Sequence, residues 1–184
     1  QILAFLTMNL PEEINTDTIH REKENLINYI KIKDVKKSVI RAQYESYSKE
    51  LGKKSMTETY VALRVYLDHQ DWHAIPIYLR SGKKLKKQWT SIVIEFKPLT
   101  HQRSKKLEPN KLIMQLQPEQ KIEFHLLTKM GGTEKDYLNL ATGKTIYCAG
   151  DCVDPHGRLL LEVIRGNRLL FLCFEEVLSS WKLL

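Results

Sequence analysis

Alternating apolar and polar positions dominate the middle of the chain. Between residues 59 and 67, every second side chain can pack on one face of a strand, in the order Thr59, Val61, Leu63, Val65 and Leu67. Residues 69–74 interrupt this alternation. Pro76 cannot donate a hydrogen bond to a sheet, so it fits only at the start of the next strand, residues 77–79. The pattern predicts a central antiparallel hairpin.

The same alternation predicts further strands on both sides of this hairpin. It indicates strands at residues 89–97, 111–117 and 121–129, and the last two share one apolar face across a tight turn at residues 118–120. Residues 35–44 also alternate and are predicted as a strand, followed by a polar loop over residues 45–54. The turn-rich segment 130–155 is expected to hold at most one short strand, at residues 137–140.

Helical spacing of apolar residues occurs towards both ends of the chain. Residues 1–8 predict a short helix closed by Pro11, and a second helix is expected to begin at a cap formed by Thr16 or Asp17 and to end at Asp34. Two more helices are predicted at residues 155–166 and 175–184. Strands in the middle with helices at both ends predict an α+β fold, a largely antiparallel mixed sheet covered on one face by helices. The other face of the sheet carries apolar side chains among polar ones, which is compatible with a surface for association.

Composition narrows the class of protein. The chain has 184 residues, of which 42% are hydrophobic, so a single domain with a sizeable core is expected. Its apolar runs are too short to span a bilayer, and no signal peptide is recognisable, so no membrane association is predicted. A net charge of +7 favours an acidic partner, which could be a phosphorylated metabolite, a dinucleotide or a nucleic acid.

The cysteines and glycines exclude several kinds of site. Three cysteines are too few for a disulfide framework and fit a reducing compartment. Cys148, Cys152 and His156 are evenly spaced, but the spacing differs from zinc motifs, so no metal site is predicted. The sequence contains neither a G-x-G-x-x-G string nor a phosphate-binding P-loop, so no dinucleotide-binding unit is encoded.

The strand at residues 77–79 leads into Arg80, Gly82 and a lysine cluster at positions 83, 84, 86 and 87. One interpretation is a solvated loop. The other is an anion site, in which Gly82 allows close approach of the backbone while Lys83 and Lys87 supply point charges to a phosphate. The residues alone leave both interpretations open.

Five blocks of sequence carry a resemblance to a known family. They are QILAFLTMNLP at the start, ETYVAL, the string W-x-x-I-P-I-Y-L-R-S-G-K from Trp72 to Lys83, LQPE at residues 116–119, and RLLLEVIRGN. In this order they resemble the C-terminal domain of glucose-6-phosphate dehydrogenases. The resemblance implies that residues 1–184 form that substrate-binding and dimer-forming domain. Because the chain opens with Gln1 inside a helical pattern, we expect that an N-terminal Rossmann domain is absent from it.

The resemblance also implies which residues meet ligands. Lys83 matches the family's phosphate-binding lysine, Lys87 is the nearest candidate for an assisting basic residue, and Gln117 matches a glutamine near the substrate. Arg80 matches an arginine of a structural NADP site found in some members. Gln115, Trp89 and Val93 stand where basic residues of that site are expected, so the structural site is predicted to be absent or weak.

The implied reaction is the oxidation of D-glucose 6-phosphate to 6-phospho-D-glucono-1,5-lactone with NADP, the first step of the oxidative pentose phosphate pathway. In the family a histidine of the N-terminal domain acts as the base, and none of the histidines here falls in a matching motif. No catalytic residue is therefore predicted in this chain, and the domain alone is expected to be inactive. The family also implies a homodimer formed through the sheet and a cytoplasmic location.

The residues also allow two alternatives. The strings FLTMNLP and QYESYS also resemble the hexose-6-phosphate dehydrogenase branch of the endoplasmic reticulum, although Arg80 favours the cytosolic form. A non-enzymatic module could instead bind nucleic acid through the lysines at 83–87 and 105–111. Such a module needs aromatic residues interleaved with the basic ones, and only Trp89 is adjacent, so no nucleic acid is predicted as a partner.

Overall fold

The computed structural model of the protein describes residues 1–98, 108–129, 131, 137–145 and 153–183. The chain forms two units, one made of residues 1–84 and 153–184 and the other of residues 85–152, and each is described separately. Of the second group of lysines considered above, at residues 105–111, Lys105 and Lys106 lie outside the described residues. Among the residues described, no helix combines the length and apolar content that crossing a bilayer requires.

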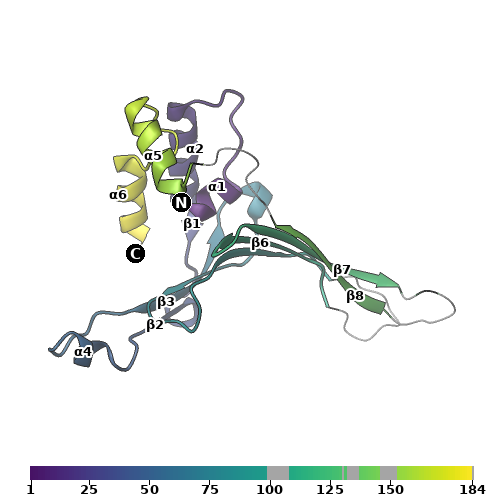
Figure 1. Ribbon diagram of the computed structural model, residues 1–184, viewed down its shortest axis with the longest axis horizontal. Coiled ribbons are helices and arrows are strands. Elements are labelled where there is room, and N and C mark those ends of the chain that lie inside the picture. The colour runs from purple at the N-terminus through teal and green to yellow at the C-terminus, as the bar shows by residue number, and fades with distance from the viewer. Residues whose placement is uncertain (99–107, 130, 132–136, 146–152, 184) are drawn as a thin grey trace. The chain divides into compact units, whose positions relative to one another are not determined.

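The first unit holds all the described helices (Figure 1). They are α1 (Ile2–Thr7), α2 (Thr16–Tyr29), α3 (Val35–Ser38), α4 (Tyr47–Glu50), a 3-10 turn (Gln70–Trp72), α5 (Pro155–Ile164) and α6 (Phe174–Leu183). The predicted cap of α2 is wrong by one position, because Asn15 and not Thr16 or Asp17 is the cap. The Asn15 side chain accepts from the Thr18 backbone N–H at 2.9 Å, and Thr18 Oγ1 accepts from the Asn15 N–H at 3.1 Å.

The strands of the first unit are β1 (Ile30–Lys31), β2 (Val39–Ala42), β3 (Tyr60–Leu67) and β4 (Ile77–Gly82). All pairings are antiparallel and centre on β3, which contacts β1, β2 and β4. The central hairpin predicted from the sequence is confirmed. The prediction of one strand over residues 35–44 is wrong in its first half, because Asp34 accepts from the Lys37 backbone N–H and caps the short helix α3. The predicted loop at 45–54 likewise contains α4.

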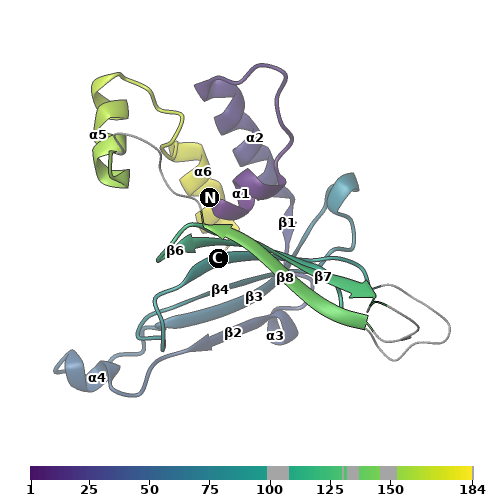
Figure 2. The same ribbon diagram turned by 45° about the vertical axis from the view of Figure 1, so that its right-hand side comes forward.

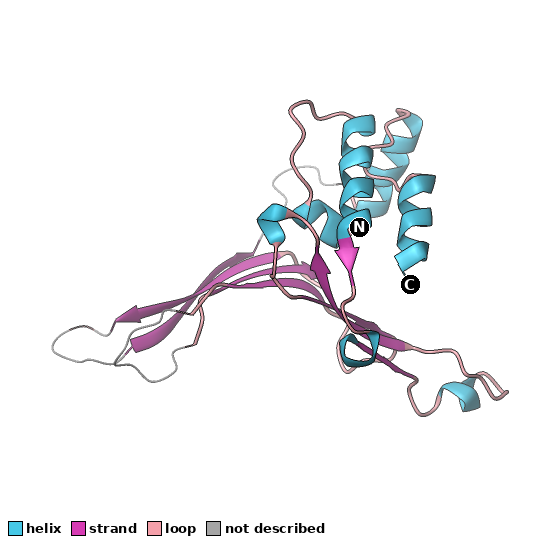
Figure 3. Ribbon diagram, turned by 180° about the vertical axis from the view of Figure 1, so that it is seen from behind, coloured by secondary structure: helices cyan, strands magenta, loops and turns pink. Residues whose placement is uncertain are grey.

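Helices cover one face of the β3 strand in this unit. Val65 and Leu67 of β3 are buried against Ala4 of α1 and Leu26 of α2, together with Ile30. The helices at the two ends of the chain lie side by side, as α2 and α6 do in Figures 1 and 2 and as the N and C marks show in Figure 3. The predicted apolar face of the strand is therefore the core-forming face.

The second unit is an antiparallel sheet in the order β5-β6-β7-β8. Its strands are β5 (Thr90–Glu95), β6 (Lys111–Gln117), β7 (Lys121–Lys129) and β8 (Tyr137–Thr145). Ile92, Met114 and Ile122 lie opposite one another in neighbouring strands, as do Ile94, Leu112 and Phe124. Facing residues of an antiparallel pair share one side of the sheet, which confirms the shared apolar face. The α+β class is confirmed, with the strands divided between two four-stranded sheets.

Strand β8 is longer than predicted. It continues through Gly143 to Thr145, whereas the sequence pattern suggested an end at residue 140. Gly143 lies opposite Glu123, and a Cβ at this position would approach Glu123 Cγ to 2.9 Å and the Ile122 carbonyl oxygen to 3.1 Å. The glycine therefore permits close packing of two strands here and does not end the strand.

Candidate phosphate-binding site

The end of strand β4 is fixed by backbone hydrogen bonds. Gly82 pairs with Tyr60, and the Lys83 backbone N–H donates to the Thr59 carbonyl oxygen at 2.8 Å, which extends the ladder one residue beyond β4. The Thr59 hydroxyl accepts from the Tyr44 backbone N–H at 2.9 Å. Thr59 therefore joins the start of the lysine cluster to the segment that follows β2.

Lys84 is bound to the α4 segment. Its ammonium group forms an ion pair with Glu50, donates to Ser46 Oγ at 2.8 Å and lies 5.1 Å from the centre of the Tyr44 ring. Tyr44 and Ser46 also donate to the Glu50 carboxylate, at 3.0 and 2.7 Å. Hydrogen bonds from Lys84, Ser46 and Tyr44 lower the pKa of Glu50 to about 2. An open cleft of about 460 Å³ beside this network is lined by Tyr44, Glu45, Ser46, Lys49 and Lys84.

The lysines of the cluster are therefore not equivalent. Within the described residues, the ammonium groups of Lys83 and Lys86 have no hydrogen bond or ion pair, whereas Lys84 is paired with Glu50. Lys87 lies with its ammonium group 6.0 Å from the centre of the Trp89 ring. Lys83 combines an anchored backbone with an uncommitted charge, which is the arrangement that an anion site requires.

In the second unit, Lys87 and Gln117 lie at the same end of the β5–β6 pair. Thr90, the first residue of β5, is opposite Gln117, and its hydroxyl donates to Gln117 Oε1 at 3.1 Å. This contact fixes the amide and leaves its NH₂ group for another acceptor. The peptide bond from Gln117 to Pro118 is cis. That Lys83 shares one site with Lys87 and Gln117 stays a prediction, because Lys83 belongs to the other unit.

Arg80, the candidate cofactor residue, lies within β4 opposite Ala62 and is exposed. Its guanidinium group has no ion pair in the part of the chain that the structure describes. Trp89 and Val93, which replace expected basic residues, are also exposed, at 52% and 55%. The prediction for the structural NADP site stays a prediction.

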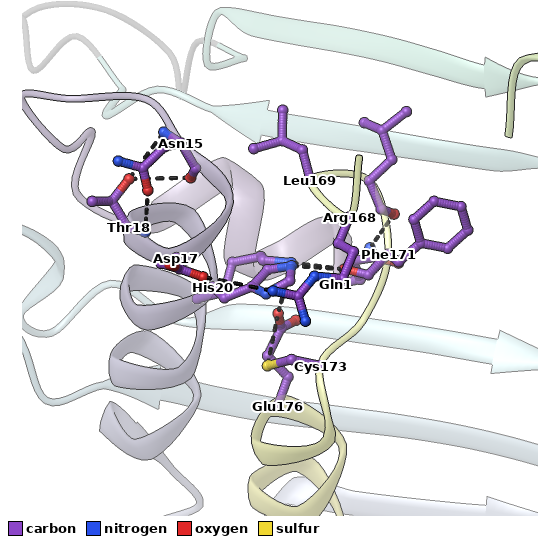
Figure 4. A network of polar contacts seen from close by, with 12 residues as sticks. Gln1, Asn15, Asp17, Thr18, His20, Arg168, Leu169, Phe171, Cys173 and Glu176 are labelled. Atoms are coloured by element: carbon purple, nitrogen blue, oxygen red, sulfur yellow. Dashed lines mark hydrogen bonds and ion pairs between the residues drawn. The ribbon is translucent and has the colours of Figure 1, made fainter. Parts of the chain in front are cut away.

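A buried ionic cluster between α2 and α6 was not predicted from the sequence; Figure 4 shows three of its members, His20, Cys173 and Glu176. Lys23 Nζ lies 2.7 Å from Glu176 Oε1, and the two side chains are 0% and 1% exposed. His20 Nε2 is 4.0 Å from the same oxygen, and Cys173 Sγ is 3.5 Å from it. Lys23 sits on the apolar side of α2 between Ile19 and Leu26, which is the sequence signal for its burial.

This cluster is interpreted as structural. The His20, Cys173 and Glu176 ligand atoms lie within 4.8 Å of one another, which is close enough to share a metal ion. The Lys23 ammonium already supplies the positive charge at Glu176, however, and burial raises the pKa of the Cys173 thiol. The ion pair links α2 to α6. Of the evenly spaced trio considered above, Cys148 and Cys152 lie outside the described residues and His156 is exposed beside Asp154.

These features define a class: an α+β domain in which an antiparallel hairpin presents, directly after a glycine, a lysine with no charged partner among the described residues. Residues 1–184 match the family model described as "Glucose-6-phosphate dehydrogenase, C-terminal domain". The chain belongs to the family of glucose-6-phosphate dehydrogenase C-terminal domains.

Several relatives support this assignment. The glucose-6-phosphate 1-dehydrogenase of Buchnera aphidicola subsp. Acyrthosiphon pisum is 35% identical over 99% of this chain and 42% of its own length, and the enzyme of Dickeya dadantii is 34% identical over the same shares. The crystal structure of the Mycobacterium avium enzyme superposes with a TM-score of 0.85 at 25% identity, covering 100% of this chain and 40% of that one. The chain thus spans less than half the length of these relatives.

Proposed function

We propose that this chain is the substrate-binding and dimer-forming part of an NADP-dependent dehydrogenase that oxidises D-glucose 6-phosphate to 6-phospho-D-glucono-1,5-lactone. Relatives that match 99% of the chain at 34–35% identity carry the name glucose-6-phosphate 1-dehydrogenase. A solved structure with the same fold, at a TM-score of 0.86 and 22% identity, is described as that enzyme in complex with its substrate glucose 6-phosphate. The alternative of a nucleic-acid module has no comparable support.

The uncommitted charge of Lys83 is the observation that carries this proposal. A phosphate dianion is best met by a cation that no carboxylate already neutralises, and Lys84 in the same turn is neutralised by Glu50. Lys87 and Gln117 would contact the phosphate or the rim of the sugar. Binding energy from the phosphate end fixes the position of the reacting carbon, and this positioning lowers the activation barrier.

The chemical step would take place on residues outside this chain. A histidine base would remove the proton of the C1 hydroxyl while a hydride passes to the nicotinamide of NADP. The sequence has no glycine-rich string for binding a dinucleotide, so the nicotinamide cofactor would be held by the part of the relatives that this chain does not match. The isolated chain is therefore expected to bind glucose 6-phosphate without reducing NADP.

A homodimer through the sheet is part of this proposal. In β5 and β6 of the second unit, Val93 and Ile113 face each other across the strand pair, and Val93 is 55% exposed. Ile113 is also partly exposed, and neighbouring accessible apolar side chains on one sheet face favour association with another surface. A cytoplasmic location is proposed over the endoplasmic-reticulum branch, because the matched relatives named above are bacterial glucose-6-phosphate 1-dehydrogenases.

The test of the proposal is the substitution Lys83→Ala in the full-length protein, with Lys86→Ala as the matched control from the same cluster. Loss of a charged hydrogen bond of about 1.5–3 kcal/mol corresponds to a rise of roughly 10- to 150-fold in KM. We expect this rise for glucose 6-phosphate and not for free glucose, which lacks the phosphate. Equal changes for both substrates would remove Lys83 from the phosphate site. If the protein bound single-stranded DNA with an affinity that falls steeply as the salt concentration rises, and did not bind the sugar phosphate, the nucleic-acid module would be favoured.

A further inference from the structure

We propose that Glu50 is a positioning residue for the phosphate-binding lysine and that it acts through Lys84. The inference rests on the proposed function, because it gives Lys83 the phosphate as its ligand. It concerns residues 44–50 and 82–84, which all belong to the first unit. No residue of this network is expected to touch the reacting carbon.

The first step of the argument is the backbone of the turn. Lys84 has a φ angle of 53°, in the left-handed region that side chains other than glycine rarely adopt. The conformation must therefore be stabilised by contacts of the residue itself or of its neighbours. The Lys83 backbone N–H provides one such contact, at Thr59.

The second step is the anchoring of the Lys84 side chain. Its ammonium group is held by the Glu50 carboxylate, by Ser46 Oγ at 2.8 Å and by the face of the Tyr44 ring at 5.1 Å. Glu50 in turn accepts hydrogen bonds from Ser46 and Tyr44. A carboxylate with three donors has few alternative orientations, so it can hold Lys84 in one position.

The third step is the direction of the neighbouring side chain. Because Lys84 is held towards α4 in a left-handed conformation, the preceding residue Lys83 has a defined backbone on both sides. Its ammonium group can then approach the substrate without first ordering the turn, which reduces the entropic cost of binding. The Glu50–Lys84 pair also keeps a second lysine from competing for the phosphate.

A positioning role and a purely electrostatic role of Glu50 predict opposite changes in anion binding when its charge is removed. Removal of a negative charge near an anion site strengthens anion binding through the Coulomb interaction alone. Loss of the contact that holds the turn weakens anion binding. The substitution Glu50→Gln therefore distinguishes the two effects by the direction in which KM moves.

The experiment measures KM and kcat for glucose 6-phosphate and for free glucose in the full-length protein. For Glu50→Gln we expect KM for glucose 6-phosphate to rise about two- to fivefold, the range for an exposed ion pair, with kcat and KM for free glucose unchanged. The matched control is Glu58→Gln. Glu58 also forms an ion pair, with Arg41, and its side chain is 47% exposed, compared with 48% for the side chain of Glu50. Lys84→Arg keeps the ion pair and should stay near the wild type.

A double-substitution cycle tests whether Glu50 acts through Lys84. In a Lys84→Gly background the partner is gone and glycine adopts the left-handed conformation freely, so Glu50→Gln should have no further effect on KM. If Glu50→Gln alone unfolds the protein, Ser46→Ala, which removes one donor to the carboxylate, replaces it and should also raise KM selectively.

The outcomes separate this inference from the proposed function. If Lys83→Ala raises KM for glucose 6-phosphate selectively but Glu50→Gln leaves it unchanged or lowers it, the positioning role is overturned and the proposed function stands. An equal rise for both substrates with Glu50→Gln would show a general structural role and would also overturn it. If Lys83→Ala itself shows no preference between the substrates, both proposals fail.

Discussion

Lys23 and Glu176 form a buried ion pair between α2 and α6, and its disruption gives the most quantitative prediction. The side chains are 0% and 1% exposed, with 2.7 Å between Lys23 Nζ and Glu176 Oε1. The substitution Lys23→Met keeps a long flexible side chain but removes the charge, which leaves the Glu176 carboxylate buried. Its second oxygen, Oε2, already lacks a hydrogen-bond partner among the residues that the structure describes.

The expected cost follows from the desolvation of an unpaired charge. Breaking a buried pair by removing one partner destabilises proteins by about 3–5 kcal/mol. Cys173 Sγ, at 3.5 Å, donates a weak hydrogen bond to Oε1, and His20 Nε2 lies 4.0 Å from the same oxygen, so neither replaces the short charged contact with Lys23. Since proteins are typically stable by about 5–15 kcal/mol, this loss is a large fraction of the total.

A second substitution separates the value of the pair from the cost of the orphaned charge. In the double variant Lys23→Met, Glu176→Leu neither charge remains, and apolar replacements of buried pairs are often neutral or stabilising. We therefore expect the double variant to recover most of the stability lost in Lys23→Met. The coupling between the two substitutions should exceed about 2 kcal/mol in a double-mutant cycle.

Chemical denaturation of the full-length protein measures these differences. The control is Lys37→Met, because Lys37 forms an exposed pair with Asp34 at 3.8 Å with its side chain 80% exposed. That control should cost less than about 1 kcal/mol. If Lys23→Met were no more destabilising than Lys37→Met, the buried pair would not link the two helices as argued.

Three further predictions concern other parts of the chain. The substitution Asn15→Ala removes the cap of α2 and should destabilise the protein by about 1 kcal/mol in denaturation experiments. Asn15→Asp keeps a capping oxygen and should be close to the wild type in stability. Gly143→Ala should cost about 1–3 kcal/mol and speed amide exchange in β7 and β8, whereas Gly131→Ala, with open space around its Cα, should not. The carboxyl group of Glu50 should titrate at about pH 2 by nuclear magnetic resonance. In Lys84→Met its pKa should rise, but stay below the usual value because the hydrogen bonds from Ser46 and Tyr44 remain. Because the pKa of Glu50 is lower in the folded state, its ionised carboxylate stabilises the protein above the unfolded-state pKa, and this stabilisation is lost as the pH falls towards 2. A titration midpoint above about pH 4 for Glu50 in the wild-type protein would contradict the network.

Strand prediction was most accurate where one face is apolar over the whole strand. The bounds expected for β6 and β7, residues 111–117 and 121–129, agree with the structure. The period of two is a local property, so it can be read from the sequence without knowledge of the partner strand. The same period predicts a strand wrongly at residues 35–38, where the side-chain cap at Asp34 stabilises a helical turn.

The candidate site was predicted only as a set of residue types. The string R-S-G-K identified Lys83, and LQPE identified Gln117, through resemblance to a family. The sequence could not distinguish among neighbouring lysines, because their partners lie elsewhere in the chain. The hydrogen bond from Thr90 to Gln117 likewise depends on the register of β5 and β6.

The α+β class, the central hairpin and the family could all be predicted before the fold was known, because they depend on local periodicity and on short strings of residues. Folding brings Glu50 to Lys84 and neutralises this lysine, whereas Lys83 meets no charged partner in the part of the chain that the structure describes. The packing of α2 against α6 likewise brings Lys23 into contact with Glu176. The strength of an ion pair depends on the distance between the two charges and on their burial, and both are set when segments far apart in the chain pack together.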